Sequence, residues 1–225
     1  MNPIFEDRIE AGRLLGRKLS KYADRDDVLV LALPRGGVPV AFEVAQTLHA
    51  ALDIFVVRKL GVPGHEEFAM GAIASGGVCV LNRETLSSLH IPPHLIERVA
   101  AVERRELERR EQVYRSNRLQ PEIAGKTVIL VDDGVATGST MLAALQALRK
   151  KLPAHLVVAV PVASESAAQA LESAADEFVA VLVPEIFFGV GRWYVDFSQT
   201  TDAEVRDLLA KSHLRRTVLP AAKAA

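Results

Sequence analysis

The 225-residue sequence has few features that would set it apart from ordinary globular proteins. Its single cysteine, Cys79, excludes an internal disulfide and fits a reducing compartment. The formal net charge of -1 gives no sign of a nucleic-acid surface. We see neither an N-terminal signal pattern nor a long apolar run, so we expect no membrane span and a cytoplasmic location. With 49% hydrophobic residues, the chain can bury the core of one α/β domain.

The most informative stretch is Val128 to Met141, which reads V-I-L-V-D-D-G-V-A-T-G-S-T-M. It opens with apolar, mostly β-branched residues, a pattern typical of a buried strand in a parallel sheet. Two carboxylates follow, and a helical pattern then runs from Met141 to about Lys151. Between the acids and the helix lie glycines and hydroxyls, namely Gly134, Thr137, Gly138, Ser139 and Thr140.

A turn of this composition suits a phosphate. The start of a helix presents free backbone N–H groups, and glycines let that backbone close around an anion. Asp132 and Asp133 would repel phosphate, so sugar hydroxyls or a phosphate-bound Mg²⁺ are their natural partners. The stretch is neither a Walker A loop, which has four residues between its glycines and then a Lys, nor a G-x-G-x-x-G fingerprint. A Walker B strand would look similar, but no Walker A precedes it. The residues therefore indicate a phosphorylated sugar as ligand.

This stretch resembles the signature of the type I phosphoribosyltransferases, which bind 5-phosphoribosyl-1-pyrophosphate (PRPP). The resemblance implies that Asp132 and Asp133 contact the ribose hydroxyls. It also implies that the loop cradles the 5′-phosphate through Gly134, Val135, Ala136, Thr137, Gly138, Ser139 and Thr140. The alternative is a βα turn with no ligand.

A second strand–glycine–helix unit lies earlier in the chain. The apolar strand Val28 to Leu33 ends in Pro34-Arg35-Gly36-Gly37, and a helix follows from about Val40 to His49. Arg35 supplies positive charge, and the glycines allow close approach of an anion. A tight turn is the structural alternative. In the resembled family this is the pyrophosphate loop, which often holds a non-proline cis peptide, so we predict one near Arg35.

We interpret Leu52 to Val57 as a third strand, which ends in Arg58-Lys59. Leu60 to Ala69 is polar and glycine-rich and predicts a flexible loop carrying His65; short strands Gly71 to Ala74 and Val78 to Leu81 then flank the turn Ser75-Gly76-Gly77. This arrangement resembles orotate-type members of the family, in which the loop closes over PRPP. The resemblance implies that Arg58, Lys59 and His65 bind pyrophosphate. For His65, a solvated loop residue is an equal alternative.

The remaining periodicities predict a mainly parallel, doubly wound, Rossmann-like α/β sheet with right-handed crossovers and a long inserted helix. The resemblance implies a small hood as well. The glycine turns and Arg58-Lys59 should meet at its carboxyl edge. We expect one domain, with a core at about 5–183, a hood and C-terminal helix at about 184–211 and a flexible tail at 212–225. Four further helices are expected, at 5–22, at 92–116, at 164–175 with Ser164 as N-cap, and from a Thr201–Glu204 capping box to about Lys211. In the helix 92–116, Glu106–Arg110 and Glu111–Arg115 are i,i+4 pairs. The other strands are Leu156–Val162 and Phe178–Val183. The long charged helix 92–116 either packs on the core or builds a subunit contact or part of the hood.

The hood segment, Pro184 to Thr201, is rich in aromatic residues. Phe187, Phe188, Trp193, Tyr194 and Phe197 could stack a planar base, or they could plug the end of the sheet. The stretch around Asp196 resembles the hood of purine-type transferases, in which the acid reaches metal-bound pyrophosphate.

The resemblance implies displacement of pyrophosphate from C1 of PRPP by a nitrogenous base. The catalytic groups would be Asp132, Asp133, Arg35 and Lys59. Mg²⁺ would be held mainly by the substrate, with Asp132 and Asp133 as its possible protein ligands. Ala136 stands where 6-oxopurine transferases carry an acid, which argues against hypoxanthine or guanine and leaves the acceptor open.

Over its length to about Lys211 the chain resembles a group of uncharacterised predicted phosphoribosyltransferases, and we expect a homodimer. The alternatives are a non-catalytic regulator that binds PRPP or a nucleotide, and a PRPP-making kinase, for which an ATP-binding feature is lacking.

Overall fold

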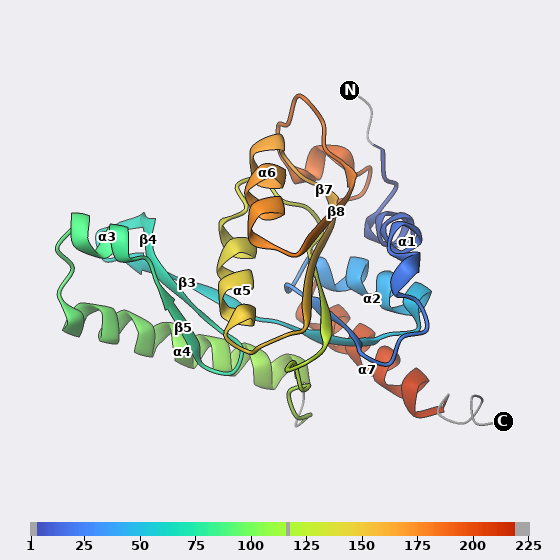
Figure 1. The fold of residues 1–225 in the computed structure, drawn as a ribbon, viewed down its shortest axis with the longest axis horizontal. Helices are drawn as coiled ribbons and strands as arrows, with labels where there is room; N and C mark the ends of the chain where they lie inside the picture. The colour runs from blue at the N-terminus through green and yellow to red at the C-terminus, as the bar shows by residue number, and fades with distance from the viewer. Residues whose placement is uncertain (1–3, 116–117, 219–225) are drawn as a thin grey trace.

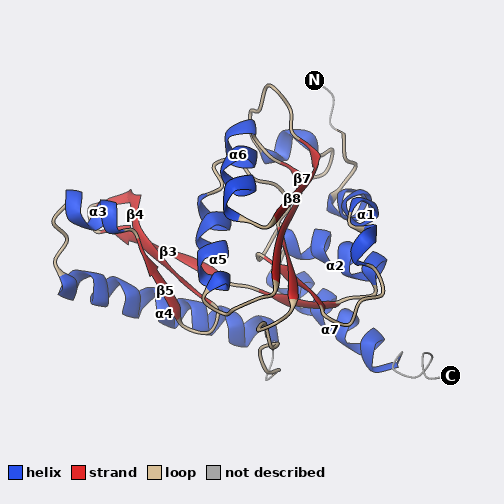
Figure 2. Cartoon of the chain, viewed as in Figure 1, coloured by secondary structure: helices blue, strands red, loops and turns tan. Residues whose placement is uncertain are grey.

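Five parallel strands form the central sheet of the molecule, with helices on both faces (Figures 1 and 2). The computed structural model describes residues 4–115 and 118–218. The strand order is β2-β1-β6-β7-β8, and each neighbouring pair is parallel. The strands are β1 (Val28–Ala32), β2 (Ala51–Ile54), β6 (Thr127–Val131), β7 (His155–Val162) and β8 (Glu177–Leu182). The predicted doubly wound α/β fold is confirmed.

The sheet is buried on both faces because its strands are apolar at nearly every position. Side chains alternate between two hydrophobic clusters, so that Val30 and Ile129 belong to one and Leu31 and Leu130 to the other. On the first face lie α1 (Arg8–Lys18), α2 (Gly37–Leu48) and α7 (Asp202–Val218); on the second lie α5 (Ser139–Arg149) and α6 (Glu165–Ala174). This coverage on both sides explains the continuous apolar runs of the sequence.

The helix ends follow the predicted caps. Ser164 Oγ accepts the N–H of Ala167 at the start of α6, and Thr201 Oγ1 accepts the N–H of Glu204 at the start of α7. The last helix continues to Val218, beyond the expected end near Lys211, because Ser212 is still buried and no proline occurs between Lys211 and Pro220. Residues 219–225 of that tail lie outside the described part of the chain.

The region between β2 and β6 differs most from the sequence prediction. Leu52 to Val57 is not one strand, since β2 ends at Ile54 and a new strand, β3 (Val57–Val62), begins. The expected flexible loop at Leu60 to Ala69 is wrong as well, because β3 forms an antiparallel hairpin with β4 (His65–Ala74). The strand β5 (Val78–Leu81) completes a second sheet of order β3-β4-β5.

This second sheet forms an arm with α3 (Arg83–Ser88) and α4 (Pro93–Arg115), to the left of the central sheet in Figure 1. The predicted long helix is confirmed to Arg115, whereas Ser116 lies outside the described residues. Both expected i,i+4 ion pairs form, with Arg110 Nε 2.8 Å from Glu106 and Arg115 Nη1 2.5 Å from Glu111. The helix α3 had not been expected.

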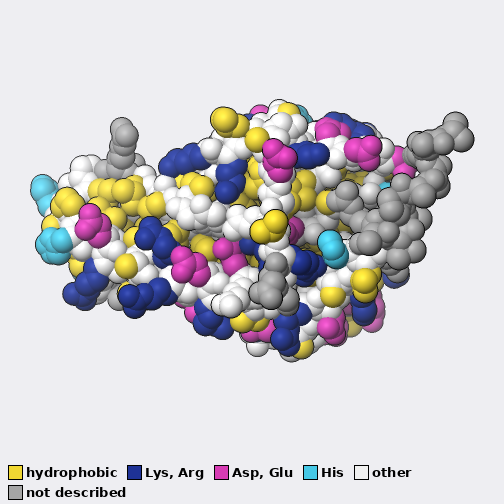
Figure 3. Space-filling model, turned by 90° about the horizontal axis from the view of Figure 1, so that it is seen from below, with side chains coloured by type: hydrophobic (Ala, Val, Ile, Leu, Met, Phe, Trp, Pro, Cys, Tyr) yellow, Lys and Arg dark blue, Asp and Glu magenta, His cyan; other side chains and the backbone are white. Residues whose placement is uncertain are grey.

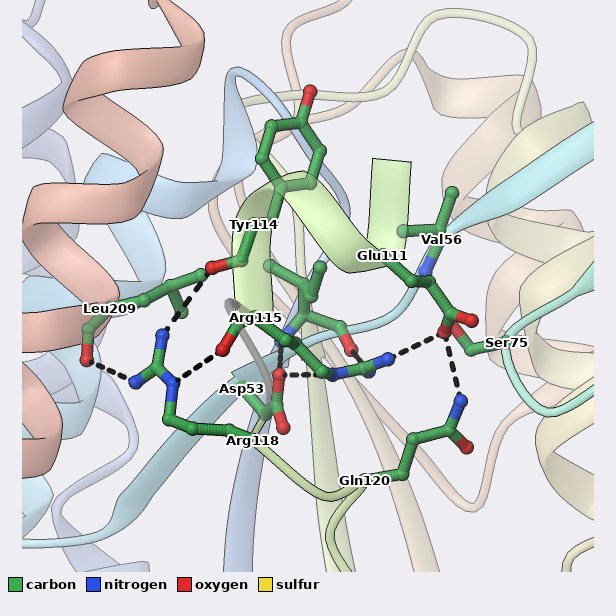
Figure 4. A network of polar contacts seen from close by, with 10 residues as sticks. Asp53, Val56, Ser75, Glu111, Tyr114, Arg115, Arg118, Gln120 and Leu209 are labelled. Atoms are coloured by element: carbon green, nitrogen blue, oxygen red, sulfur yellow. Dashed lines mark hydrogen bonds and ion pairs between the residues drawn. The ribbon is translucent and has the colours of Figure 1, made fainter. Parts of the chain in front are cut away.

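The arm joins the core through a buried polar network centred on Arg115 (Figure 4). Arg115 is only 5% exposed, and its guanidinium donates to the carboxylates of Asp53 and Glu111 and to the carbonyl of Ile54. Arg118 adds a bond to the carbonyl of Leu209 on α7. The end of α4 is thereby tied to both the sheet and the last helix.

Viewed from below, the surface mixes Lys and Arg with Asp and Glu, and apolar side chains gather on the arm (Figure 3). Among the described residues, we find no helix that combines the length and the apolar character of a membrane span.

Candidate active site

Two loops at the carboxyl edge of the central sheet lie against each other. One follows β1 and contains Pro34-Arg35-Gly36-Gly37, and the other follows β6 and begins with Asp132-Asp133. β1 and β6 are neighbours in register, with Ala32 opposite Val131, and the N–H of Leu33 donates to the Val131 carbonyl. The predicted meeting of the two glycine turns at one edge is confirmed.

The contact between these loops requires glycine. A Cβ on Gly36 would lie 2.0 Å from Oδ2 of Asp133, and a Cβ on Gly37 would lie 2.8 Å from the carbonyl oxygen of Val131. Neither glycine has a positive φ, so close approach rather than backbone freedom explains both. The Pro34–Arg35 peptide bond is cis, as predicted. The backbone of the first loop therefore packs directly on the acid pair.

The loop after the acids is fixed to the next strand–helix unit. The N–H of Val135 donates to the Val162 carbonyl, and Oγ of Ser164 donates to the Ala136 carbonyl over 2.6 Å. Gly138, with a φ of +75°, is the N-cap of α5 and places no side chain on the helix's first N–H groups. Ala136, Thr137, Ser139 and Thr140 are exposed. The loop thus presents exposed hydroxyls, two of which (Thr137 and Ser139) lie 3.0 Å from each other, and helix amides without a side-chain cap, which suits an anion.

The two carboxylates differ in their surroundings. Asp132 Oδ1 accepts the N–H of Asp133 over 2.9 Å. Burial raises the pKa of Asp132 well above its ordinary value, and the neighbouring Asp133 carboxylate raises it further. Burial also raises the pKa of Asp133, but the Arg8 guanidinium opposes that shift. The two carboxylates therefore lie next to each other in a buried position, where ionising both of them is unfavourable. Such shifted pKa values are typical of binding sites.

Arg8 was missed by sequence reasoning. It begins α1, and both its Nε and its Nη2 lie 2.8 Å from Oδ2 of Asp133. The apolar periodicity of the N-terminal helix predicts that its charged residues face solvent. No pattern in the sequence therefore indicated this contact.

Arg35 and Asp202 form a second link that spacing did not reveal. Arg35 Nη1 lies 3.7 Å from Oδ1 of Asp202, the first residue of α7. The same carboxylate oxygen accepts the hydroxyl of Tyr114 from α4 over 2.8 Å. Arg35 therefore lies at the edge of the site within ion-pair distance of a partly exposed carboxylate of the same chain.

Arg58 and Lys59 are not at the carboxyl end of a core strand, contrary to prediction. They lie within β3, opposite Ile73 and Ala72 of β4. Arg58 is paired with Glu103 of α4 at 2.6 Å, whereas Lys59 is exposed. His65 is exposed at the start of β4, opposite Val62. These residues belong to the arm because the apolar run after Ile54 continues into the hairpin.

The hood aromatics divide into buried and exposed rings. Trp193 and Tyr194 are 3% and 5% exposed and pack with Phe5, and the hydroxyl of Tyr194 donates to the Asp133 carbonyl. This burial favours the alternative in which they plug the end of the sheet. Phe187 is partly buried and packs on the same cluster, whereas Phe188 is 77% exposed. Asp196 is exposed and accepts the N–H of Ser198.

The carboxylates of Asp132 and Asp133 are oxygen ligands of the kind Mg²⁺ prefers. Among the described residues, no group of three or more His, Cys, Asp or Glu side chains could hold a metal alone. These donors therefore fit a metal that takes its other ligands from a bound substrate.

A cavity of about 330 Å³ lies at the opposite, amino edge of the sheet. It is lined by Lys21, Tyr22, Arg25, Thr127, His155 and Glu177. Its cations are already paired, Lys21 with Glu177 and Arg25 with Asp27. The carboxyl edge, with its loops and acid pair, is the better candidate for chemistry.

Known proteins are similar to this chain in sequence and in fold. A family model described as a phosphoribosyl transferase domain matches residues 4–194. A relative from Mycobacterium tuberculosis, named "Putative phosphoribosyl transferase", is 42% identical over 93% of this chain. The match covers 47% of that protein, so the chain spans about half the length of the curated relatives it matches.

Two solved structures share the fold. The TT1426 protein of Thermus thermophilus is 44% identical, with a TM-score of 0.84 over 94% of this chain and 99% of that one. The AQ2163 protein of Aquifex aeolicus, 14% identical with a TM-score of 0.51 over 85% of this chain and 86% of that one, is similar in fold alone.

Proposed function

This chain belongs to the phosphoribosyl transferase domain family, and from that premise we propose that it transfers the 5-phosphoribosyl group of PRPP to a nitrogenous base. The observation that carries the proposal is the contact between the Gly36 loop and Asp133. In that contact two glycine turns, each suited to an anion, lie on either side of an acid pair, and this arrangement supports the proposal. A ligand with a phosphate, a polyol and a second phosphate group matches that order.

Each part of the site has a task in the proposed reaction. The loop from Gly134 to Thr140 holds the 5′-phosphate through backbone amides and hydroxyls. Asp132 and Asp133 accept hydrogen bonds from the ribose hydroxyls. Gly36 and Gly37 let the backbone approach the pyrophosphate, and Arg35 balances its charge. Arg58, Lys59 and His65 stay predictions for pyrophosphate, which in this structure would require the arm to contribute them.

In the chemical step the nitrogen lone pair of the base forms a bond to C1 as the C1–O bond to pyrophosphate breaks. The pyrophosphate leaves with the bonding electron pair, and the nitrogen loses its proton to solvent. Positive charge develops on the ribose, and the nearby carboxylates stabilise it. Mg²⁺, when bound with the substrate, would neutralise the departing pyrophosphate.

Phe188 is the hood aromatic with the most exposed ring, whereas Trp193 and Tyr194 are buried, so it is our candidate for contact with an acceptor base. A homodimer and a cytoplasmic location remain part of the proposal, and the apolar side chains of Leu81, Leu89 and Val102 on the arm would suit a subunit contact.

Pyrophosphate release tests the proposal. The protein is incubated with Mg²⁺ and PRPP, and nitrogenous bases are screened as acceptors. We expect release with at least one base and loss of that release in the D132N/D133N variant. Binding of PRPP without release for any base would instead favour the regulator, which keeps the fold without turnover.

A further inference from the structure

The side chain of Arg8 is held on every side. Its Nε and Nη2 contact Asp133, and its Nη1 donates to the Ser198 carbonyl over 2.8 Å. The guanidinium carbon lies 4.0 Å from the centre of the Phe197 ring and 5.9 Å from that of Tyr194. Only 11% of the Arg8 side chain is exposed. A planar guanidinium fixed by donors and by an aromatic face is a rigid part of the site.

Arg8 contacts only one carboxylate oxygen of Asp133. Both close contacts converge on Oδ2, which is also the oxygen nearest to Gly36. A Cβ on Gly36 would lie 2.0 Å from Oδ2 but 3.3 Å from Oδ1. With Oδ2 fixed between Arg8 and the loop backbone, Oδ1 has a fixed direction. A hydroxyl that binds Oδ1 finds its acceptor already oriented, which lowers the cost of ordering the site.

The hood also contacts Arg8 and Asp133. Phe197 stacks on Arg8, Ser198 accepts from it, and the hydroxyl of Tyr194 donates to the Asp133 carbonyl over 2.5 Å. The N-terminal helix, the hood and the acid pair therefore meet at one guanidinium.

We propose that Arg8 is a positioning residue, which fixes Asp133 through Oδ2 so that Oδ1 is presented to a ribose hydroxyl of the donor. This inference rests on the proposed function. Arg8 does not contact the donor; it acts through Asp133. Loss of Arg8 should therefore weaken recognition of the ribose and leave recognition of pyrophosphate, which depends on the Arg35 loop, unchanged.

Calorimetry with two probes, PRPP and inorganic pyrophosphate, each with Mg²⁺, tests this. We expect R8M to weaken PRPP binding about tenfold, the value of one charge-assisted hydrogen bond, because Asp133 Oδ1 is no longer oriented toward the ribose hydroxyl. Pyrophosphate binding should stay within about twofold of the wild type, which is the scatter of unrelated surface substitutions. R8K, which keeps the charge but not the double contact, should recover part of the loss. R13M is the matched control, because Arg13 lies on the same helix in an exposed pair with Glu43, and it should change neither affinity.

A double-mutant comparison asks whether Arg8 acts through Asp133. In a D133N background, R8M should cause almost no further loss of PRPP affinity, since the oriented carboxylate is already absent. Equal loss of PRPP and pyrophosphate binding in both R8M and R8K would overturn the proposal, because it would assign Arg8 a general structural role. A full further loss in the D133N background would also overturn it. If the wild type binds pyrophosphate but no PRPP, the proposed function fails instead.

Discussion

Arg35 Nη1 lies 3.7 Å from Oδ1 of Asp202, and the same oxygen accepts the hydroxyl of Tyr114. A loop after β1, the start of α7 and the end of α4 therefore meet at one carboxylate. Burial and the hydrogen bond to Asp202 raise the pKa of Tyr114 to about 12, so its hydroxyl stays a donor at neutral pH. An incoming pyrophosphate would have to compete with Asp202 for Arg35.

We therefore expect D202N to strengthen PRPP binding. Both side chains are more than a third exposed, so the pair is worth about 0.2–1 kcal/mol, and the gain in affinity should be at most about fivefold. Asn keeps an acceptor for Tyr114. Titration calorimetry with Mg²⁺ measures the effect, and D207N, an exposed acid on the same helix, serves as control. Weaker PRPP binding in D202N would show that Asp202 supports the site rather than competing for Arg35.

Substitution of Gly36 tests the contact between the two loops. G36A would place its Cβ against Oδ2 of Asp133, so we expect a loss of stability of about 1–3 kcal/mol together with loss of PRPP binding. The control is G125A: Gly125 has a φ of +70° with open space around it, so Ala strains the backbone there without touching the site. Urea unfolding and PRPP titration are compared for both. PRPP binding by G36A at the level of G125A would count against a donor that spans the two loops.

Asp132 should cost the folded protein stability at neutral pH. Its pKa is raised on folding, chiefly by burial and then by Asp133, so the folded state binds more protons than the unfolded state between the two pKa values. Stability must then fall as pH rises through that interval. In EDTA at pH 7 we expect D132N to be more stable than the wild type by about 1 kcal/mol, and the difference should shrink toward pH 4. Thermal unfolding across this pH range measures it, and a D132N variant that is less stable at pH 7 would refute the expectation.

The network in Figure 4 predicts which arginine anchors the arm. R115M leaves the carboxylate of Asp53 without its buried partner, so we expect a loss of about 3–5 kcal/mol in unfolding free energy. Burial already raises the pKa of Asp53, and Arg115 opposes that shift. R109M is the control on the same helix, because its pair with Glu106 is exposed, and it should cost less than about 1 kcal/mol. Similar losses in the two variants would mean that Arg115 contributes little to holding the arm.

The sequence predicted those parts of the site that follow from local pattern. Strand, turn and helix signals follow one another within about fifteen residues in two places. One is the stretch around Asp132-Asp133, and the other is the stretch around Arg35. Their meeting follows from the rule that parallel strands share a carboxyl edge. The cis peptide at Arg35 was expected from the family resemblance alone.

The remainder depends on tertiary contacts that local pattern does not encode. Arg8 reaches Asp133 across 125 residues of sequence, and the spacing of α1 shows only an amphipathic helix. The hairpin that holds Arg58 and Lys59 was misread because β2 and β3 lie in one apolar run, with only two residues between them. Burial of Trp193 and Tyr194 depends on Phe5, which packs against them from the opposite end of the chain.

The most direct measurement is calorimetric titration of the wild-type protein and of D132N/D133N with PRPP in the presence of Mg²⁺. A donor bound across the carboxyl edge predicts one PRPP per chain in the wild type and at least about tenfold weaker binding in the double variant, since charged hydrogen bonds to the ribose are lost. Absence of Mg²⁺-dependent binding to the wild type, or equal affinity in the double variant, would contradict a donor site at Asp132 and Asp133.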